Sequence, residues 1–176
     1  MQDLFDYARK SGIELKNVGR CQFCNSNVSH GVFECHDNLN CLTKILDFNN
    51  SIYYEARFLS VDTMALQHCE LHGPWNNHIH LTRLCLIFEK GIEWNYFKTP
   101  LLSNIINAYK KDKREFLTPP QWGKRGKLTS LDLLKASTPE ECINLVKEWA
   151  HEVYHSFSNH HTLVSILANN YLNKYN

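Results

Sequence analysis

The sequence lacks any apolar run that approaches the roughly 20 residues needed to cross a bilayer. It also lacks the positively charged start of a signal peptide, because Asp3 and Asp6 stand near its N-terminus. Its charges nearly cancel, with 19 Lys and Arg residues against 18 Asp and Glu residues and a net charge of +1. A nucleic-acid-binding surface needs clustered Lys and Arg, so nucleic acid is not an expected partner. We therefore expect a cytoplasmic protein without a membrane segment.

Strand signals are scarce as well, since no alternating apolar pattern runs beyond residues 27–34. Hydrophobic residues make up 43% of the chain, enough to fill a single core at this length. We expect residues 1–17 to be an N-terminal extension and residues 18–176 to be one domain. Within it, residues 18–41 should form an irregular loop rich in cysteine and histidine, and residues 42–174 a helical bundle. The predicted fold class is mainly α.

Helical spacing of apolar residues dominates the chain after Cys41. Thr138 followed by Pro139 is a typical helix start, and Gly91 is a typical helix stop. The expected helices cover residues 3–10, 42–48, 53–68, 76–90, 94–117, 130–134, 139–157 and 160–173.

The seven cysteines are an odd number in a chain without a secretion signal, which favours free thiols and metal ligands over disulfides. Cys21 and Cys24 form a CxxC pair, the commonest half of a tetrahedral zinc site, because one tight turn can direct both sulfurs at one ion. The sequence therefore predicts a zinc site. The other ligands must come from a wider set, namely His30, Cys35, His36, Cys41, His68, His80, His160 and His161.

Two arrangements of this site are consistent with the sequence. In the first, Cys21 and Cys24 join two helical histidines from among His68, His80 and His161, which ties the loop to the bundle. We favour it because one ion then orders an otherwise loose loop. Asp62 and His160 are the expected neighbours that orient these histidines.

In the second arrangement, His30 and Cys41 complete a local site with the CxxC pair. The helical histidines then remain for a separate, open metal site. An open site with three histidines activates water, so a metal-dependent hydrolase using His68, His80 and His161 is an alternative function.

A second motif also suggests hydrolysis. His151, Glu152 and His155 match HExxH on a predicted helix, where Glu152 would be the general base, and His161 stands at the third-ligand spacing of metzincin proteases. Against this, Ser158 replaces the glycine of that motif, no methionine follows, and 15 residues after His161 are too few for a protease subdomain. The alternative interpretation places both histidines on an outer helix face.

Plainer interpretations apply to other residues. Cys21 and Cys24 could be a redox pair, although no thioredoxin-like pattern surrounds them. Cys69, Cys85 and Cys142 are expected in the core. The basic segment 124–127 lies in a loop rich in Pro and Gly, where contact with an anion is a further possibility.

From Cys21 to about Leu167 the sequence resembles a bacterial family of unknown function, domain of unknown function 5946. The likeness rests on ordered blocks, which are Cys21-x-x-Cys24, His30 and Cys41, Val61-Asp62-x-x-Ala65-x-Gln67-His68, His80-Leu81-x-x-Leu84-Cys85-Leu86, and Trp149-Ala150 followed by His160-His161. Asn25 departs from the small residue that follows the family's cysteine pair, and Cys69 from the proline after its Gln-His pair. The resemblance implies a set of positions and no known activity.

Together these observations predict a cytoplasmic zinc-binding protein with a structural or interaction role, in which a protein partner is possible but unidentified. A metal-dependent hydrolase is the alternative, and a thiol redox sensor is the second alternative.

Overall fold

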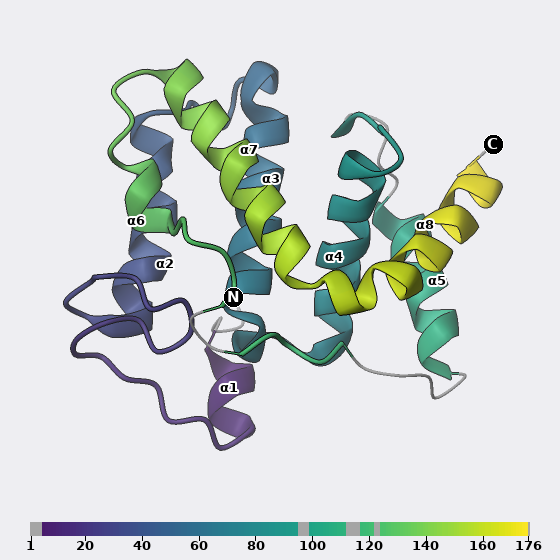
Figure 1. Cartoon of the computed structure of the whole chain (residues 1–176), viewed down its shortest axis with the longest axis horizontal. Helices are drawn as coiled ribbons and strands as arrows, with labels where there is room; N and C mark the ends of the chain where they lie inside the picture. Colours follow the sequence, from purple (N-terminus) through teal and green to yellow (C-terminus); the bar gives the residue numbers. More distant parts are fainter. Residues whose placement is uncertain (1–4, 95–98, 112–116, 122–123, 176) are drawn as a thin grey trace.

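A computed structural model describes residues 5–94, 99–111, 117–121 and 124–175 of the chain. They form eight α-helices and, within the described residues, no β-strand (Figure 1). The helices are α1 (Asp6–Lys10), α2 (Gly31–Cys41), α3 (Tyr54–Gln67), α4 (Pro74–Phe88), α5 (Thr99–Lys111), α6 (Ser130–Leu133), α7 (Pro139–Ser156) and α8 (His161–Tyr175). The predicted mainly α fold is confirmed.

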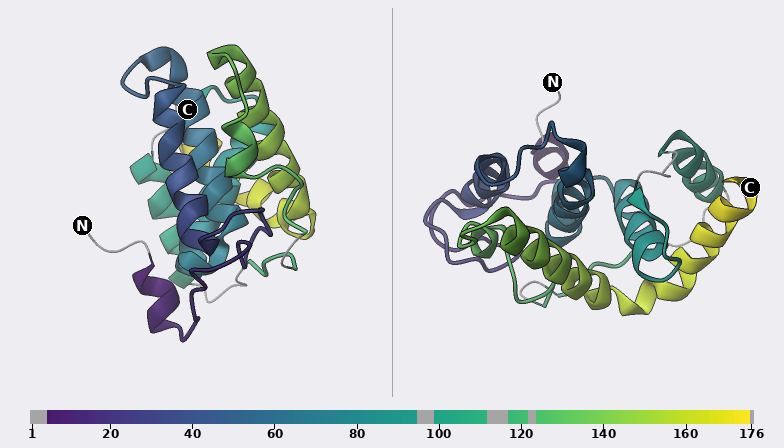
Figure 2. Two further views of the ribbon diagram at one scale, coloured as in Figure 1. Left: turned by 90° about the vertical axis from the view of Figure 1, so that its left-hand side faces the viewer. Right: turned by 90° about the horizontal axis from the view of Figure 1, so that it is seen from above.

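Helix α3 lies at the centre of the bundle. It packs against α7 on one side and α4 on the other, and α4 in turn contacts α5 and α8. Helices α2 and α6 pack together beside α3, and the N-terminal loop runs beneath them (Figures 1 and 2). The N-terminal cysteines are thereby brought close to the C-terminal end of α3.

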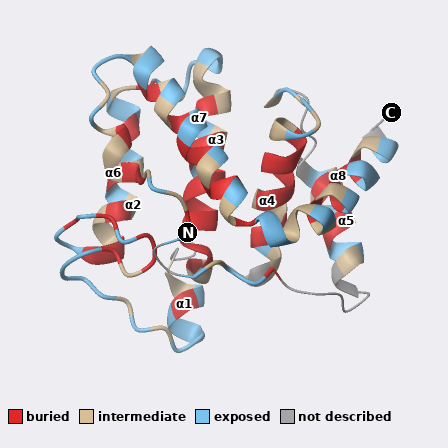
Figure 3. Ribbon diagram, viewed as in Figure 1, coloured by how far each residue is buried: buried red, intermediate tan, exposed pale blue. Residues whose placement is uncertain are grey.

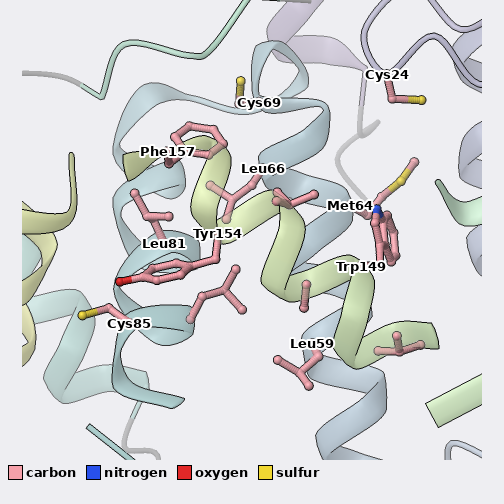
Figure 4. Packing of buried hydrophobic residues seen from close by; sticks show 14 of the residues in the cluster. Cys24, Leu59, Met64, Leu66, Cys69, Leu81, Cys85, Trp149, Tyr154 and Phe157 are labelled. Atoms are coloured by element: carbon pink, nitrogen blue, oxygen red, sulfur yellow. The ribbon is translucent and has the colours of Figure 1, made fainter. Parts of the chain in front are cut away.

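The core is formed by the buried sides of the long helices, and the central helices α3 and α4 are buried on several faces (Figure 3). Trp149 of α7 is its largest fully buried side chain (Figure 4), and its Nε1 donates to Oε1 of Gln67 in α3 at 3.2 Å. Cys69, Cys85 and Cys142 are all buried in this core, as predicted. The core thus holds α3 and α7 rigidly against each other.

Most predicted helices are confirmed, but the N-terminal third differs from expectation. The loop is irregular only as far as His30, because Gly31–Cys41 is α2. The Glu34 carboxylate accepts the backbone N–H groups of Ser29 and His30, at 2.8 and 2.9 Å, and so satisfies donors that the start of α2 leaves free. Polar residues along α2 interrupt the apolar periodicity that would have predicted a helix.

The predicted helix at 42–48 is reduced to a 3₁₀ turn at Leu42–Lys44. The side chain of Asp47 accepts the backbone N–H of Asn49 at 3.0 Å, and that of Asn50 accepts the N–H of Ile52 at 3.1 Å. Such local bonds compete with helical ones and favour turns. Apolar spacing at 42–48 was therefore outweighed by turn chemistry.

Within the described part of the chain, none of the helices combines the length and apolarity that spanning a bilayer requires.

Candidate metal centre

Four side chains that could bind a metal ion converge in the interior. The Sγ atoms of Cys21, Cys24 and Cys35 and one ring nitrogen of His68 all lie within 4.8 Å of one another. The Sγ of Cys21 is 3.4 Å from Nε2 of His68, and the Sγ atoms of Cys24 and Cys35 are 3.5 Å apart. We call these four residues the Cys3His cluster.

The cysteine turn, residues 21–26, places the first two sulfurs. The backbone N–H of Asn25 donates to the carbonyl of Cys21 at 2.9 Å, and the N–H of Cys21 donates to the carbonyl of Ser26 at 3.1 Å. Asn25 adopts a left-handed conformation with φ of 61°, which asparagine tolerates better than most residues. This tight turn holds Cys21 and Cys24 on the same side of the backbone, as the CxxC spacing predicts.

Helix α2 supplies the third sulfur. It begins at Gly31, whose φ is +57° and where an added Cβ would lie 2.0 Å from the Lys16 carbonyl oxygen, so no side chain fits there. One turn later, Cys35 is buried, and its carbonyl accepts a hydrogen bond from Ser130 Oγ of α6 at 2.9 Å. This hydrogen bond fixes the backbone of Cys35 against α6.

His68 supplies the imidazole from the C-terminal end of α3. Its Nδ1 lies 3.0 Å from the carbonyl oxygen of Met64, a contact that places the proton on Nδ1. Nε2 then carries the free lone pair and faces Cys21. Metal-bound histidines characteristically donate their other ring N–H to a carbonyl or carboxylate, so His68 is oriented as a ligand.

The spacing of the cluster suits a tetrahedral ion. With Zn–S near 2.3 Å and Zn–N near 2.0–2.1 Å, tetrahedral ligands would lie about 3.8 Å apart for two sulfurs and about 3.5 Å apart for sulfur and nitrogen. The separations of 3.5 and 3.4 Å are close to these values. A Cys3His donor set is a common structural zinc set. The residues therefore fit zinc in both chemistry and distance.

Electrostatics also favour a cation here. The hydrogen bond with Cys24 lowers the pKa of the Cys21 thiol, and the same contact raises the pKa of Cys24. Contact with Cys21 raises the pKa of Cys35 to about 12. One thiolate thus suppresses ionisation of its neighbours, and a divalent ion would remove that repulsion and allow all three to ionise.

The other expected loop ligands lie outside the cluster. His30 is exposed, and its Nδ1 is 3.2 Å from the Glu34 carboxylate that caps α2. Cys41 ends α2 and is half-buried. The structure therefore joins the CxxC pair to a helical histidine, as in the favoured arrangement, with Cys35 in place of a second histidine.

His80 lies in a separate polar group. Its Nδ1 is 2.8 Å from Asp62 Oδ1, and Arg83 donates from Nε to Asp62 Oδ2 at 2.9 Å and from a second nitrogen to Oδ1. Asp62 is fully buried. The Asp62 carboxylate orients a histidine, as expected, but that histidine is not a member of the Cys3His cluster, and Arg83 is a second partner that no sequence motif indicates.

His160 and His161, at the start of α8, are also apart from the cluster. His160 Nε2 lies 3.0 Å from both the backbone nitrogen and the carbonyl oxygen of Thr118. His161 Nε2 is 3.0 Å from the carbonyl oxygen of Tyr154, and its ring stacks on the Tyr154 ring. His160 thus contacts the segment 117–121, and His161 contacts the C-terminal part of α7.

The HExxH motif divides between two faces of α7. His151 and His155 are exposed, as the outer-face interpretation predicts, and their Nε2 atoms are 3.0 Å apart. Glu152 Oε2 instead accepts the backbone N–H groups of Lys127 and Leu128, at 2.6 and 3.0 Å. Glu152 is thus bound to a loop and not placed as a base beside the histidine pair.

Cys35 belongs to the wider set of candidate ligands in the sequence, and the structure places it in the cluster. Its signal is helical periodicity, because Val32, Cys35 and Leu42 are all buried along α2 and its continuation. An irregular loop over residues 18–41, as predicted, has no such periodicity, so the prediction gave no reason to prefer Cys35. Cys41 lies at the end of α2 on another face, and His30 precedes the helix.

Comparisons with known proteins identify a family and no activity. The model of a family of unknown function, DUF5946, matches residues 19–158. No curated protein and no solved structure matches the chain. The matched region includes the whole Cys3His cluster and extends from the cysteine turn through α7. The chain therefore belongs to the family of unknown function DUF5946.

Proposed function

We propose that this protein binds one zinc ion at the Cys3His cluster and that the ion has a structural role, holding the N-terminal segment against the helical bundle. The observation that carries the proposal is the convergence of three sulfurs and one correctly oriented imidazole from three separate segments. All seven cysteines are free thiols, and a reducing cytoplasm would keep them available for metal.

Burial and ligand number favour a structural over a catalytic role. The exposed fractions of Cys21, Cys24, Cys35 and His68 are 2, 7, 0 and 1%. A site with four protein ligands leaves no position for water, whereas catalytic zinc sites keep one open. An interaction role for the surface that the ion organises is compatible with this site.

The segments joined by the cluster explain what the ion would stabilise. The cysteine turn has little regular structure, and a single isolated bridge, Gly19 with His30, closes its base. Its side-chain contacts with the rest of the protein include a 3.1 Å hydrogen bond between Ser26 and Thr129. Binding one ion would add bonds from this turn to both α2 and α3, and metal-binding free energy then becomes folding free energy.

Metal analysis of untagged protein tests the proposal directly. We expect about one tightly held zinc per chain, and removal by a strong chelator should lower the melting temperature and release the N-terminal segment to proteolysis. X-ray absorption at the zinc edge should report three sulfurs and one nitrogen. Metal-free protein with a reversible Cys21–Cys24 disulfide would instead support the redox alternative.

The His151–His155 pair supports a second candidate function, an exchangeable metal site. Two imidazole nitrogens 3.0 Å apart on one helix face can bind one transition-metal ion, with remaining positions filled by water. Within the described residues no third ligand joins this pair. That leaves it short of the three-histidine set that the hydrolase alternative requires.

Titration of zinc-loaded protein with Ni²⁺ distinguishes the two sites. The pair should bind a second ion reversibly, and His155→Gln should abolish this binding while leaving the first zinc in place. Hydrolysis of an unstructured test substrate that depends on this second ion would support the hydrolase alternative. Saturable Ni²⁺ binding that survives His155→Gln would exclude the pair as a site.

A further inference from the structure

A hollow of about 580 Å³ lies between the cysteine turn and α6. Its wall includes Arg20, Cys24 and Asn25 from one side, and Lys127, Asp132 and Lys135 from the other. The volume falls within the range of small-molecule sites, roughly 300–1,000 Å³. Because Cys24 is also a member of the Cys3His cluster, the hollow shares a wall with the proposed metal site.

The lining carries an excess of positive charge. Three of the six residues named above are cationic, and Asp132 is acidic. The Asp132 carboxylate is already engaged, with Lys135 Nζ at 2.7 Å from Oδ1 and the backbone N–H of Thr129 at 2.9 Å from Oδ2. Arg20 donates from Nη1 to the Asn25 carbonyl oxygen at 3.4 Å, but neither Arg20 nor Lys127 forms an ion pair with any described residue. Two cations on opposite walls therefore remain available to a ligand.

Both walls are held in place before any ligand arrives. On the α6 side, the Glu152 carboxylate accepts the backbone N–H groups of Lys127 and Leu128. Gly126 has a positive φ and packs closely on Glu152, because an added Cβ would lie 3.2 Å from the Glu152 side chain. The hydrogen bond between the Ser26 and Thr129 hydroxyls joins this wall to the cysteine turn on the other side. Fixed walls lower the entropy lost when a ligand binds.

We propose that this hollow binds a small anion carrying a phosphate group, held between Arg20 and Lys127. Polar side chains and a surplus of cations suit a phosphate better than an apolar ligand, and arginine and lysine are the side chains that recognise phosphate most often. The hollow is larger than an inorganic phosphate ion, so it has room for the organic part of a phosphate monoester. Since the cysteine turn forms one wall, metal and ligand would organise the same segment.

Solution NMR on the intact, zinc-analysed protein tests the proposal with three probes: inorganic phosphate, adenosine 5′-monophosphate and uncharged adenosine. We expect saturable shifts confined to residues 20–27 and 126–135 with both phosphates and none with adenosine. Tighter binding of the monophosphate would identify an organic phosphate as the ligand, and equal binding would identify free phosphate. Binding should weaken as NaCl is raised, because exposed charges are screened.

Charge-matched variants make the test specific. Arg20→Gln and Lys127→Gln should each weaken phosphate binding about tenfold, the loss of one charge-assisted hydrogen bond. Lys44→Gln removes the same charge from an exposed position outside the hollow and should leave binding unchanged. Absence of saturable shifts, equal binding of adenosine, or equal weakening by Lys44→Gln would overturn the proposal.

This outcome is separable from that of the metal proposal. Zinc content is measured on the same samples, and neither Arg20 nor Lys127 belongs to the Cys3His cluster. Zinc-loaded protein without phosphate binding would refute the anion site alone. Phosphate binding by protein that never contains zinc would refute the structural zinc site alone.

Discussion

The Sγ of Cys21 lies 3.4 Å from Nε2 of His68, although 47 positions separate the two residues in the sequence. The contact joins the irregular N-terminal turn to the end of the central helix α3. An ion bound here would link Cys21 to His68 and so close the long chain segment between them. The longer the closed segment, the more conformational entropy the link removes from the unfolded chain, which favours the folded state. The stability of the N-terminal segment should therefore depend on the cluster.

The first prediction concerns which cysteine completes the cluster. Cys35→Ser should lose most of the bound zinc and lower the melting temperature by several degrees, because a hydroxyl is a poor zinc ligand and the remaining thiolates repel each other. Cys41→Ser on the same helix is the matched control and should retain one zinc per chain. Elemental analysis and thermal denaturation of both variants check this. Zinc loss in Cys41→Ser with retention in Cys35→Ser would support the local site with His30 instead.

The second prediction separates the Asp62 group from the metal site. Asp62→Asn leaves the buried Arg83 guanidinium without its counter-charge, which should cost about 3–5 kcal/mol of unfolding free energy. Zinc content should not change, because Asp62 orients His80 and not a member of the cluster. Chemical denaturation measures the first effect and metal analysis the second. Asp37→Asn, an exposed change on α2, serves as the control and should be nearly neutral.

The fold was largely predictable from the sequence because its long helices carry regular apolar spacing and recognisable ends. Thr138, for example, caps α7 by accepting the N–H of Glu141 at 3.2 Å, and Pro139 occupies the first turn. Helix α2 was missed because its start depends on a side-chain cap from Glu34 and on a glycine that fits beside Lys16. Neither interaction has a signal in apolar periodicity.

The site was predictable in part, and the reason is geometric. The CxxC spacing is a local property of one turn, so Cys21 and Cys24 could be assigned as neighbours from sequence alone. Partners from distant segments depend on how helices pack, and eight cysteines and histidines were available for those places. His68 is distinguished by its position at a helix end, where its Nδ1 reaches the Met64 carbonyl. His80 lies within α4 and His161 begins α8, and their partners are Asp62 and the Tyr154 carbonyl oxygen.

The third prediction concerns Glu152 of the HExxH motif. Glu152→Ala removes the acceptor for two backbone N–H groups of the 124–128 loop, which should cost about 1–3 kcal/mol of unfolding free energy and increase hydrogen exchange at Lys127 and Leu128. The control is Glu148→Ala, an exposed position one turn earlier on α7, which should have little effect. If Glu152→Ala instead abolishes a measurable metal-dependent hydrolysis without changing stability, Glu152 is a catalytic base.

His72 lies just after the short turn Cys69–Leu71, with its ring centroid 5.9 Å from that of His80. Burial, followed by the charges of His80, His68 and His36, lowers its pKa to about 4. An unfolded chain would titrate this histidine near 6.5, so between pH 6.5 and pH 4 the unfolded state binds more protons than the folded state. Stability from this residue is thus complete above pH 6.5 and is lost as the pH falls toward 4.

The fourth prediction follows from that difference in proton binding. His72→Gln should flatten the decline in unfolding free energy between pH 6.5 and pH 5, with up to about 3 kcal/mol at stake over the whole window to pH 4. Urea denaturation at several pH values measures it, with zinc content checked at each pH because acid also protonates thiolate ligands. An identical slope in wild type and His72→Gln, at equal zinc content, would show that His72 is not held neutral by burial.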